Sequence, residues 1–258
     1  MIITKIQGGL GNQMFQYAYG KHLATKYKKK LYCDINFYQY QSLRNFSLQD
    51  FENIDLDTSV DNIKVDFPIY KIDDNFNYKE IPEPNNGGYY LDGYWQSEKY
   101  FKESEFIIRE DFKPNEETLS KLLRTPFIDS NTISLHIRRT DYVTSNGYHP
   151  VQPIEYYQNA VEKIGEYDYI FVFSDDIHWC KENLNFKNMI FIDGFTDIED
   201  LHLMSMCKNN IIANSSFSWW GAWLNSNPNK IVIAPNKWFG DRANLNESDI
   251  IPINWIRL

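Results

Sequence analysis

The sequence contains few cysteines, and none of them is placed to form a cluster. The three thiols, Cys33, Cys180 and Cys207, show neither a CxxC pair nor the spacing to histidine that zinc sites use. An odd number of isolated cysteines argues against a disulfide framework and against a structural zinc site. We therefore expect buried free thiols in a protein of a reducing compartment, the cytoplasm.

Long apolar runs, internal repeats and low-complexity linkers are also missing. No run reaches the roughly 18 apolar residues that span a membrane. The first predicted strand begins at residue 2, which leaves no room for a signal peptide. The basic cluster Lys28–Lys30 permits a peripheral contact with the inner membrane face, although a solvated helix end explains the same lysines.

Positively charged residues are fewer than negatively charged ones. The sequence has 26 Lys and Arg residues and 35 Asp and Glu residues, which gives a net charge of −9. Nucleic acids attract proteins with the opposite balance, so we expect no nucleic-acid partner. Aromatic residues, in contrast, are abundant at 16%. This content is typical of a tyrosine-rich core and equally of a surface that stacks on bases or sugars.

The 258 residues are enough for one large domain or two smaller ones. In the first half, the apolar pattern predicts a strand at 2–6, a helix at 12–27, a strand at 30–35, and a strand running into a loop or helix at 89–101. Residues 44–88 are rich in Asp and Asn and show no clear pattern.

The second half alternates short apolar runs with helical patterns. Strands are predicted to begin near residues 133, 169, 190, 211 and 231, and helices to span 153–164, 176–184, 197–207 and 218–226. This alternation is typical of a parallel sheet covered by helices on both faces. We predict an α/β protein with two Rossmann-like domains facing a cleft, residues 1–130 and 131–258, with the segment 236–258 able to pack back on the first.

In such sheets, ligands bind at the carboxyl ends of the strands, and four polar segments stand there. The first is the turn GGLGNQM, residues 8–14, which holds two of the three glycines of a dinucleotide-binding fingerprint. Met14 replaces the third glycine, and Asp34 is the acid that would bind a ribose. An NAD-dependent oxidoreductase therefore remains an alternative function. The amides of Asn12 and Gln13 instead favour a turn that forms hydrogen bonds with its ligand directly.

The second segment is HIRRTDY, residues 136–142. Strand alternation places His136 and Arg138 on one face, with Arg138 at the strand end, where its guanidinium can bind a phosphate through two hydrogen bonds. The alternative is a structural ion pair with a neighbour such as Asp141.

The third and fourth segments are FVFSDD, residues 171–176, and ANSSFSWWGAWL, residues 213–224. The carboxylates of the third can accept hydrogen bonds from a guanine edge, cap the next helix or bind a metal. In the fourth, polar side chains precede a helix and are typical of an anion site, although a single serine would suffice as an ordinary N-cap. We expect its tryptophans to pack the helix.

Together these segments resemble a known family. GGLGNQMFQYA, HIRRTDYV, FVFSDD and NSSFSWWGAWL occur in the order found in the bacterial α-1,2-fucosyltransferases of glycosyltransferase family 11, and HIRRTD is similar to a motif of α-1,6- and protein O-fucosyltransferases. The resemblance covers residues 3 to about 240 and is poor over 44–88. It implies a GT-B fold, GDP-fucose as donor, no metal cofactor, and α-1,2 transfer with inversion to the 2-hydroxyl of a terminal galactose on an oligosaccharide or lipid-linked glycan.

The resemblance also implies roles for single residues. Arg138 would contact the β-phosphate, and His136 and Asp175 would lie near the guanine. The pyrophosphate would be held by Asn214, Ser215, Ser216, Phe217 and Ser218, and the turn with Gly9, Gly11 and Asn12 would close over the donor. Asp141 is the candidate base, or it orients an arginine; Tyr94, Trp95 and Gln96 are candidates for acceptor binding, or they belong to the core.

These residue types suit the chemistry. Departure of GDP leaves negative charge on the pyrophosphate, which a metal ion or hydrogen-bonding cations must stabilise. The only DxD, Asp55–Asp57, lies away from any predicted strand end, so Arg138 and the serine-rich helix start are the expected replacement for an ion. The alternatives are the oxidoreductase and a non-catalytic glycan-binding module, which the aromatic content would suit.

Overall fold

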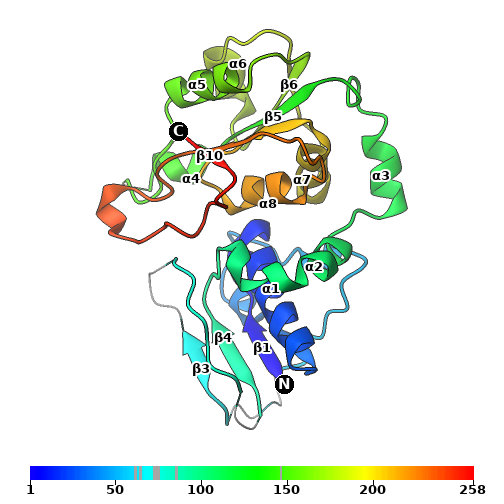
Figure 1. Ribbon diagram of the computed structural model, residues 1–258, viewed down its shortest axis with the longest axis vertical. Helices are drawn as coiled ribbons and strands as arrows, with labels where there is room; N and C mark the ends of the chain where they lie inside the picture. The colour runs from blue at the N-terminus through cyan, green and yellow to red at the C-terminus, as the bar shows by residue number, and fades with distance from the viewer. Residues whose placement is uncertain (61–62, 64–65, 72–75, 85–86, 146) are drawn as a thin grey trace. The chain divides into compact units, whose positions relative to one another are not determined.

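Figure 1 shows the computed structural model, which describes residues 1–60, 63, 66–71, 76–84, 87–145 and 147–258. The chain divides into two compact units. Unit 1 contains Met1–Asn115 and Leu245–Pro252, and unit 2 contains Glu116–Asn244 and Ile253–Leu258. Each unit is built on a parallel sheet of its own.

Unit 1 has a parallel sheet in the order β2-β1-β4-β3. Its strands are β1 (Ile2–Lys5), β2 (Leu31–Asp34), β3 (Ile69–Lys71) and β4 (Tyr89–Asp92). The strands predicted near residues 2, 30 and 89 are confirmed. Strand β3 lies within 44–88, where no pattern was visible, because a three-residue edge strand with two exposed side chains leaves almost no apolar periodicity.

Helix α1 (Leu10–Lys26) follows β1 directly and lies against it (Figure 1). Most of its side chains are buried, so it is a core helix of unit 1 and not an amphipathic surface helix. Tyr17 packs on Phe112 and donates a hydrogen bond of 2.7 Å to Asp111, the last residue of α2 (Glu105–Asp111). Short 3-10 helices span Asn36–Gln39, Leu48–Asp50, Glu98–Tyr100 and Lys102–Ser104.

Unit 2 has a parallel sheet in the order β10-β9-β8-β5-β6-β7. The strands are β5 (Thr132–Ile137), β6 (Tyr169–Ser174), β7 (Met189–Phe191), β8 (Asn209–Ile211), β9 (Val232–Ala234) and β10 (Ile256–Arg257). The helices are α3 (Glu116–Leu122), α4 (Thr140–Val143), α5 (Ile154–Ile164), α6 (Ile177–Asn183), α7 (Asp197–Met206) and α8 (Ser216–Leu224), and a 3-10 helix spans Asp241–Ala243. The predicted alternation of strands and helices is confirmed.

The two faces of this sheet have separate hydrophobic cores. Alternate side chains of β5 point to opposite faces. Ile133, Leu135 and Ile137 pack with side chains of α5 and α6. On the other face, Phe171 and Phe173 of β6 pack with α3 and α7. The ring of His136 meets Phe217 of α8, with ring centroids 5.9 Å apart.

Helices α7 and α8 approach each other closely (Figure 1). A Cβ atom added at Gly221 of α8 would lie 2.8 Å from Cβ of Met204 of α7, so only glycine fits there. Trp219, Trp220 and Trp223 are all buried, and Trp219 stacks on Trp223. The prediction that these tryptophans pack the helix is confirmed.

The unit boundary differs from the predicted domain boundary at residue 130. Helix α3 belongs to unit 2, because Leu122 joins the core against α7 and Lys121 Nζ lies 2.6 Å from Oε1 of Glu199. Of the segment 236–258, only Leu245–Pro252 belongs to unit 1. Strand β10 pairs with β9 inside unit 2.

Candidate functional site

The glycine turn connects β1 to α1. It lies at the carboxyl end of β1, an inner strand of the unit 1 sheet. Gly8 has φ +82°, which side chains rarely adopt, and a Cβ atom there would lie 2.8 Å from Nδ2 of Asn12. Gly9 is the N-cap of α1, and no side chain caps the helix. The amide of Asn12 therefore lies over the turn, beside the amino end of a long helix.

Two further side chains hold the turn in shape. Buried Gln13 donates to the carbonyls of Gly8 at 3.1 Å and Asn45 at 2.8 Å, and it accepts from the backbone N–H of Ser47 at 2.9 Å. The hydroxyl of Tyr38 also donates to the Gly8 carbonyl. Asp34, the acid that would bind a ribose in a dinucleotide site, accepts hydrogen bonds from the hydroxyl of Tyr90 at 2.6 Å and from the N–H of Asn36.

The three predicted acceptor residues follow β4 and lie in different surroundings. Tyr94 is 38% exposed and stacks on Phe76. Trp95 is only 1% exposed and packs against Tyr19 and Tyr100, so it belongs to the core of unit 1. Gln96 is buried and donates to Oδ1 of Asn12 at 2.7 Å.

In unit 2, Arg138 stands directly after the last residue of β5. Its Nη2 lies 2.8 Å from Oδ1 of Asp141, and its Nε lies 3.2 Å from Oδ2 of Asp175. The guanidinium also lies over the ring of Tyr142. Both predicted catalytic residues, Arg138 and Asp141, are therefore brought together, with the guanidinium held between two carboxylates and a ring.

Asp175 follows β6, the strand next to β5. Its carboxylate accepts hydrogen bonds from the backbone N–H groups of Arg139 and Thr140 and from the Thr140 hydroxyl, at the start of α4. Asp176 caps α6 by accepting from the N–H of Trp179. Asp175 thus fastens the Arg138 turn to the neighbouring strand.

His136 is buried in β5, and its Nδ1 has no hydrogen-bond partner among the described residues. Burial and the positive charge of Arg138 together lower the pKa of His136 to about 3, against the opposing effect of Asp175. The imidazole is therefore neutral at physiological pH and can act as a hydrogen-bond donor or acceptor, but not as a cation.

The predicted anion site at the start of α8 divides into buried and half-buried residues. Asn214 is buried and holds two loops, because its Nδ2 donates to the carbonyls of Pro150 and Trp238. Ser215 and Ser218 are also buried, and Ser218 donates to the Ser215 carbonyl. Ser216 and Phe217 are half-buried and lie nearest to the surface of this group.

Two titratable residues near these elements were not singled out by the sequence. The ring of His149 stacks on Tyr142 with centroids 4.8 Å apart, and its Nδ1 is buried without a partner among the described residues. Burial lowers the pKa of His149, while Asp141 raises it and Arg138 lowers it, so His149 is close to the Arg138 cluster. No local motif marks this histidine.

The second residue is Asp200, in the first turn of α7, which follows β7. Its Oδ1 is buried and has no hydrogen-bond partner among the described residues. Burial, together with the neighbouring carboxylates of Asp197, Glu199 and Asp193, raises the pKa of Asp200 to about 7. In the sequence, Asp197, Glu199 and Asp200 form an acidic first turn, which is common in helices.

Residues 6–258 match the family described as Glycosyl transferase family 11. The chain belongs to this family. An alpha-1,2-colitosyltransferase of Escherichia coli is 35% identical over 295 residues, which cover 100% of this chain and 99% of that protein. The O-antigen biosynthesis glycosyltransferase WbnK of Escherichia coli is 34% identical, over 98% of this chain and 99% of its own length.

Among solved structures, the NodZ alpha-1,6-fucosyltransferase soaked with GDP-fucose matches with a TM-score of 0.53 at 16% identity, over 86% of this chain and 91% of that chain. At this identity the likeness shows a shared fold. The family resemblance and the GT-B-like α/β architecture predicted for this glycosyltransferase are therefore confirmed.

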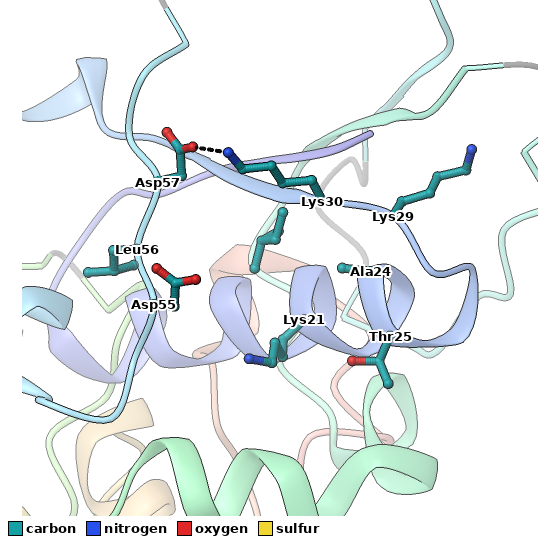
Figure 2. Close-up of a pocket in the computed structure, with 9 residues that line it drawn as sticks. Lys21, Ala24, Thr25, Lys29, Lys30, Asp55, Leu56 and Asp57 are labelled. Carbon is teal, nitrogen blue, oxygen red and sulfur yellow. Dashed lines mark ion pairs between the residues drawn. The ribbon is translucent and has the colours of Figure 1, made fainter.

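A cavity of about 410 Å³ in unit 1 of this family 11 glycosyltransferase lies at the opposite end of α1 from the glycine turn. Figure 2 shows Lys21, Asp55 and the ion pair between Lys30 and Asp57 around it. Lys30 of the basic cluster is thus held by a carboxylate. The residues that line the cavity lie outside the four segments that carry the family resemblance.

In the described part of the glycosyltransferase, no three His, Cys, Asp or Glu side chains gather as a metal site. None of the helices described is both long and apolar enough to cross a membrane. The three cysteines are buried and unpaired, as expected.

Proposed function

We propose that this glycosyltransferase transfers L-fucose from GDP-fucose to the 2-hydroxyl of a terminal galactose, with inversion at the anomeric carbon and without a metal ion. One observation carries the proposal: a guanidinium, Arg138, stands at the carboxyl end of β5 and is held there by two carboxylates, in a chain of a glycosyl transferase family. A fucosyltransferase soaked with GDP-fucose shares the fold, which supports a nucleotide sugar as donor.

Arg138 would stabilise the leaving group. When the bond between the sugar carbon and the phosphate oxygen breaks, the electron pair goes to the β-phosphate. A guanidinium meets that charge with two N–H groups, and Asp141 and Asp175 hold it in place beforehand, so that little reorganisation accompanies the reaction. The amino end of α8, with Ser216 and Phe217 nearest to the surface, would supply backbone N–H groups to the other phosphate oxygens.

Asp141 is the proposed base. The acceptor hydroxyl attacks the sugar carbon from the face opposite the leaving group, and its proton must pass to a nearby acceptor. The side chain of Asp141 is 48% exposed beside Arg138, so a substrate hydroxyl can reach it. For the acceptor ring itself, exposed Tyr94 is the proposed stacking surface, since Trp95 is buried.

Two carboxylates are available for the guanine edge, and their surroundings differ. Asp175 already accepts hydrogen bonds from the start of α4 and pairs with Arg138. Asp200, in contrast, has a buried oxygen without a partner among the described residues. We therefore add Asp200 to the proposed donor site, because an unpaired buried carboxylate is stabilised by the two N–H groups that a guanine edge presents.

Colitose is a second candidate for the transferred sugar. The observation that favours it is the 35% identity to an alpha-1,2-colitosyltransferase along the whole chain. Colitose is L-fucose without its 3-hydroxyl, so the two donors differ by one hydrogen-bonding group. A site that pairs this hydroxyl would discriminate strongly against the sugar that lacks it.

One experiment tests the proposal and separates these donors. The purified protein is incubated with GDP-fucose or GDP-colitose and a panel of galactose-terminated oligosaccharides, and NMR locates the new bond. We expect α-1,2-linked fucose on galactose. Transfer of colitose alone would replace the donor and keep the reaction type, whereas binding of NADH with no transfer from either donor would overturn the proposal.

A further inference from the structure

Gln96 and Asn12 form a partly buried amide pair that links two distant parts of unit 1. Nε2 of Gln96 donates to Oδ1 of Asn12 at 2.7 Å, across 84 residues of sequence. Gln96 is 8% exposed and Asn12 is half-buried, so the bond is partly shielded from water. The pair joins the segment after β4 to the first turn of α1, at the carboxyl ends of two adjacent parallel strands.

This bond determines which way the Asn12 amide points. Its oxygen faces Gln96, so its Nδ2 group points away from Gln96, and it lies 2.8 Å from the place that a Cβ atom at Gly8 would occupy. Within the described part of the chain, the side chain of Asn12 makes only the hydrogen bond that its oxygen accepts from Gln96, so Nδ2 is available to a ligand. The outcome is an oriented N–H donor above the glycine turn, at the positive end of the helix dipole of α1.

The segment that carries Gln96 is itself anchored at an energetic cost. Trp95 has φ +54°, a left-handed conformation that a bulky aromatic residue rarely adopts. It is retained because the ring is buried against Tyr19 and Tyr100, and the N–H of Ser97 bonds to the Trp95 carbonyl. Strain of this kind clusters where a side chain must be aimed, and the side chain aimed here is that of the next residue, Gln96.

From this geometry we propose that Gln96 is a positioning residue: it orients the Asn12 amide so that Nδ2 donates a hydrogen bond to an acceptor oxygen of the nucleotide sugar. This inference rests on the proposed function and on the donor-binding role that the family resemblance implies for Asn12. It replaces the predicted role of Gln96 in acceptor binding with a role exerted through Asn12.

A double-mutant cycle tests the inference on the full-length protein. Gln96→Leu, Asn12→Ala and the double variant are compared with the wild type for kcat/KM with GDP-fucose and for affinity towards GDP-fucose. We expect Gln96→Leu to lose about tenfold, the scale of one hydrogen bond. The double variant should lose no more than Asn12→Ala alone, because Gln96 acts only through Asn12.

Two further variants separate positioning from a general loss of stability. Tyr17→Phe removes another buried hydrogen bond of 2.7 Å from the same helix, to Asp111, and should lower the Tm while leaving transfer near the wild-type level. Gln96→Glu should not rescue activity, because a carboxylate cannot donate to Oδ1 of Asn12 and would attract Nδ2 instead.

The outcomes are distinguishable. Losses that multiply in the double variant, or a Gln96→Leu protein with wild-type donor affinity and transfer, would overturn the positioning role while leaving the proposed function intact. A wild-type protein that neither binds GDP-fucose nor transfers from it would overturn the proposed function, and this inference with it.

Discussion

The first strand of each unit runs into a helix at its carboxyl end, and the two turns are built from opposite chemistry. The turn after β1 is neutral: it consists of glycines and amides, and hydrogen bonds from Gln13 and Gln96 fix it. The turn after β5 is charged, with Arg138 held between Asp141 and Asp175. Fixed neutral donors interact similarly with a substrate and with its transition state, whereas a cation gains strength as negative charge develops.

The largest expected effect comes from breaking the charged turn. Arg138→Ala should lower kcat by about 10²–10³-fold, the scale for one preorganised charge stabiliser. Arg138→Lys should recover little, because an ammonium group cannot make the planar two-point contact. Steady-state kinetics and melting curves on the same preparations give the measurement.

The neighbouring arginine is the matched control for this variant. Arg139 stacks on Trp179 at 3.8 Å and pairs with Asp176, so Arg139→Ala should lower the Tm and change kcat far less. If Arg138→Ala were unstable but catalytically competent, Arg138 would be a structural ion-pair residue and the proposed mechanism would be wrong.

The neutral turn should respond more weakly and in a different parameter. Gly8→Ala forces a side chain into φ +82° and against the amide of Asn12, so KM for GDP-fucose should rise about tenfold, equivalent to one lost hydrogen bond, while kcat changes little. Gly165→Ala has nearly the same φ, +86°, with no atom within 4 Å of the new Cβ. It should lose similar stability and retain KM; an equal rise in KM for both variants would contradict the comparison.

A smaller effect is expected at Asp200, through pH. Because burial raises its pKa from 3.8 to about 7, the folded protein holds this proton more tightly than the unfolded chain. The stability that the group contributes is therefore present at low pH and is lost as the pH rises towards 7. Asp200→Asn should raise the Tm at about pH 8 and change it little at about pH 4. An unchanged Tm difference across this range would refute the assignment, and weaker GDP binding by the variant would support its place in the donor site.

No effect at all is expected from chelation. If Arg138 and the start of α8 replace a metal ion, transfer should proceed equally well after dialysis against EDTA. Activity that disappears in EDTA and returns with Mg²⁺ or Mn²⁺ would mean that the charged turn does not suffice.

The sequence predicted one of the two turns better than the other, for physical reasons. Arg138 could be placed because β5 alternates apolar and polar residues and its end is visible in the sequence, and its partner Asp141 is three residues away. The partner of Asn12 is 84 residues away, and no local pattern can reveal such a contact. From the sequence, Gln96 is a candidate for acceptor binding or for the core, because a polar residue beside Tyr94 and Trp95 is typical of a sugar-binding surface.

The same distinction applies to the fold. The buried strands of unit 2 carry apolar side chains in a recognisable pattern, as in β6, and could be predicted, whereas β3 and β10 are short edge strands with exposed side chains. Asp200 was missed because the sequence shows that it is acidic but not that one of its oxygens is buried.

The path of the chain between the units has a consequence for how the protein can be divided. The chain passes from one unit to the other after Asn115, after Asn244 and after Pro252, so neither unit is a continuous stretch of sequence. A fragment that ends at Asn244 would lack the part of unit 1 in which Asp249 pairs with Lys99, and it would leave β9 without its partner β10. During synthesis on the ribosome, the first unit therefore waits for the whole body of the second before its last segment arrives, and a single cut cannot yield either unit in complete form.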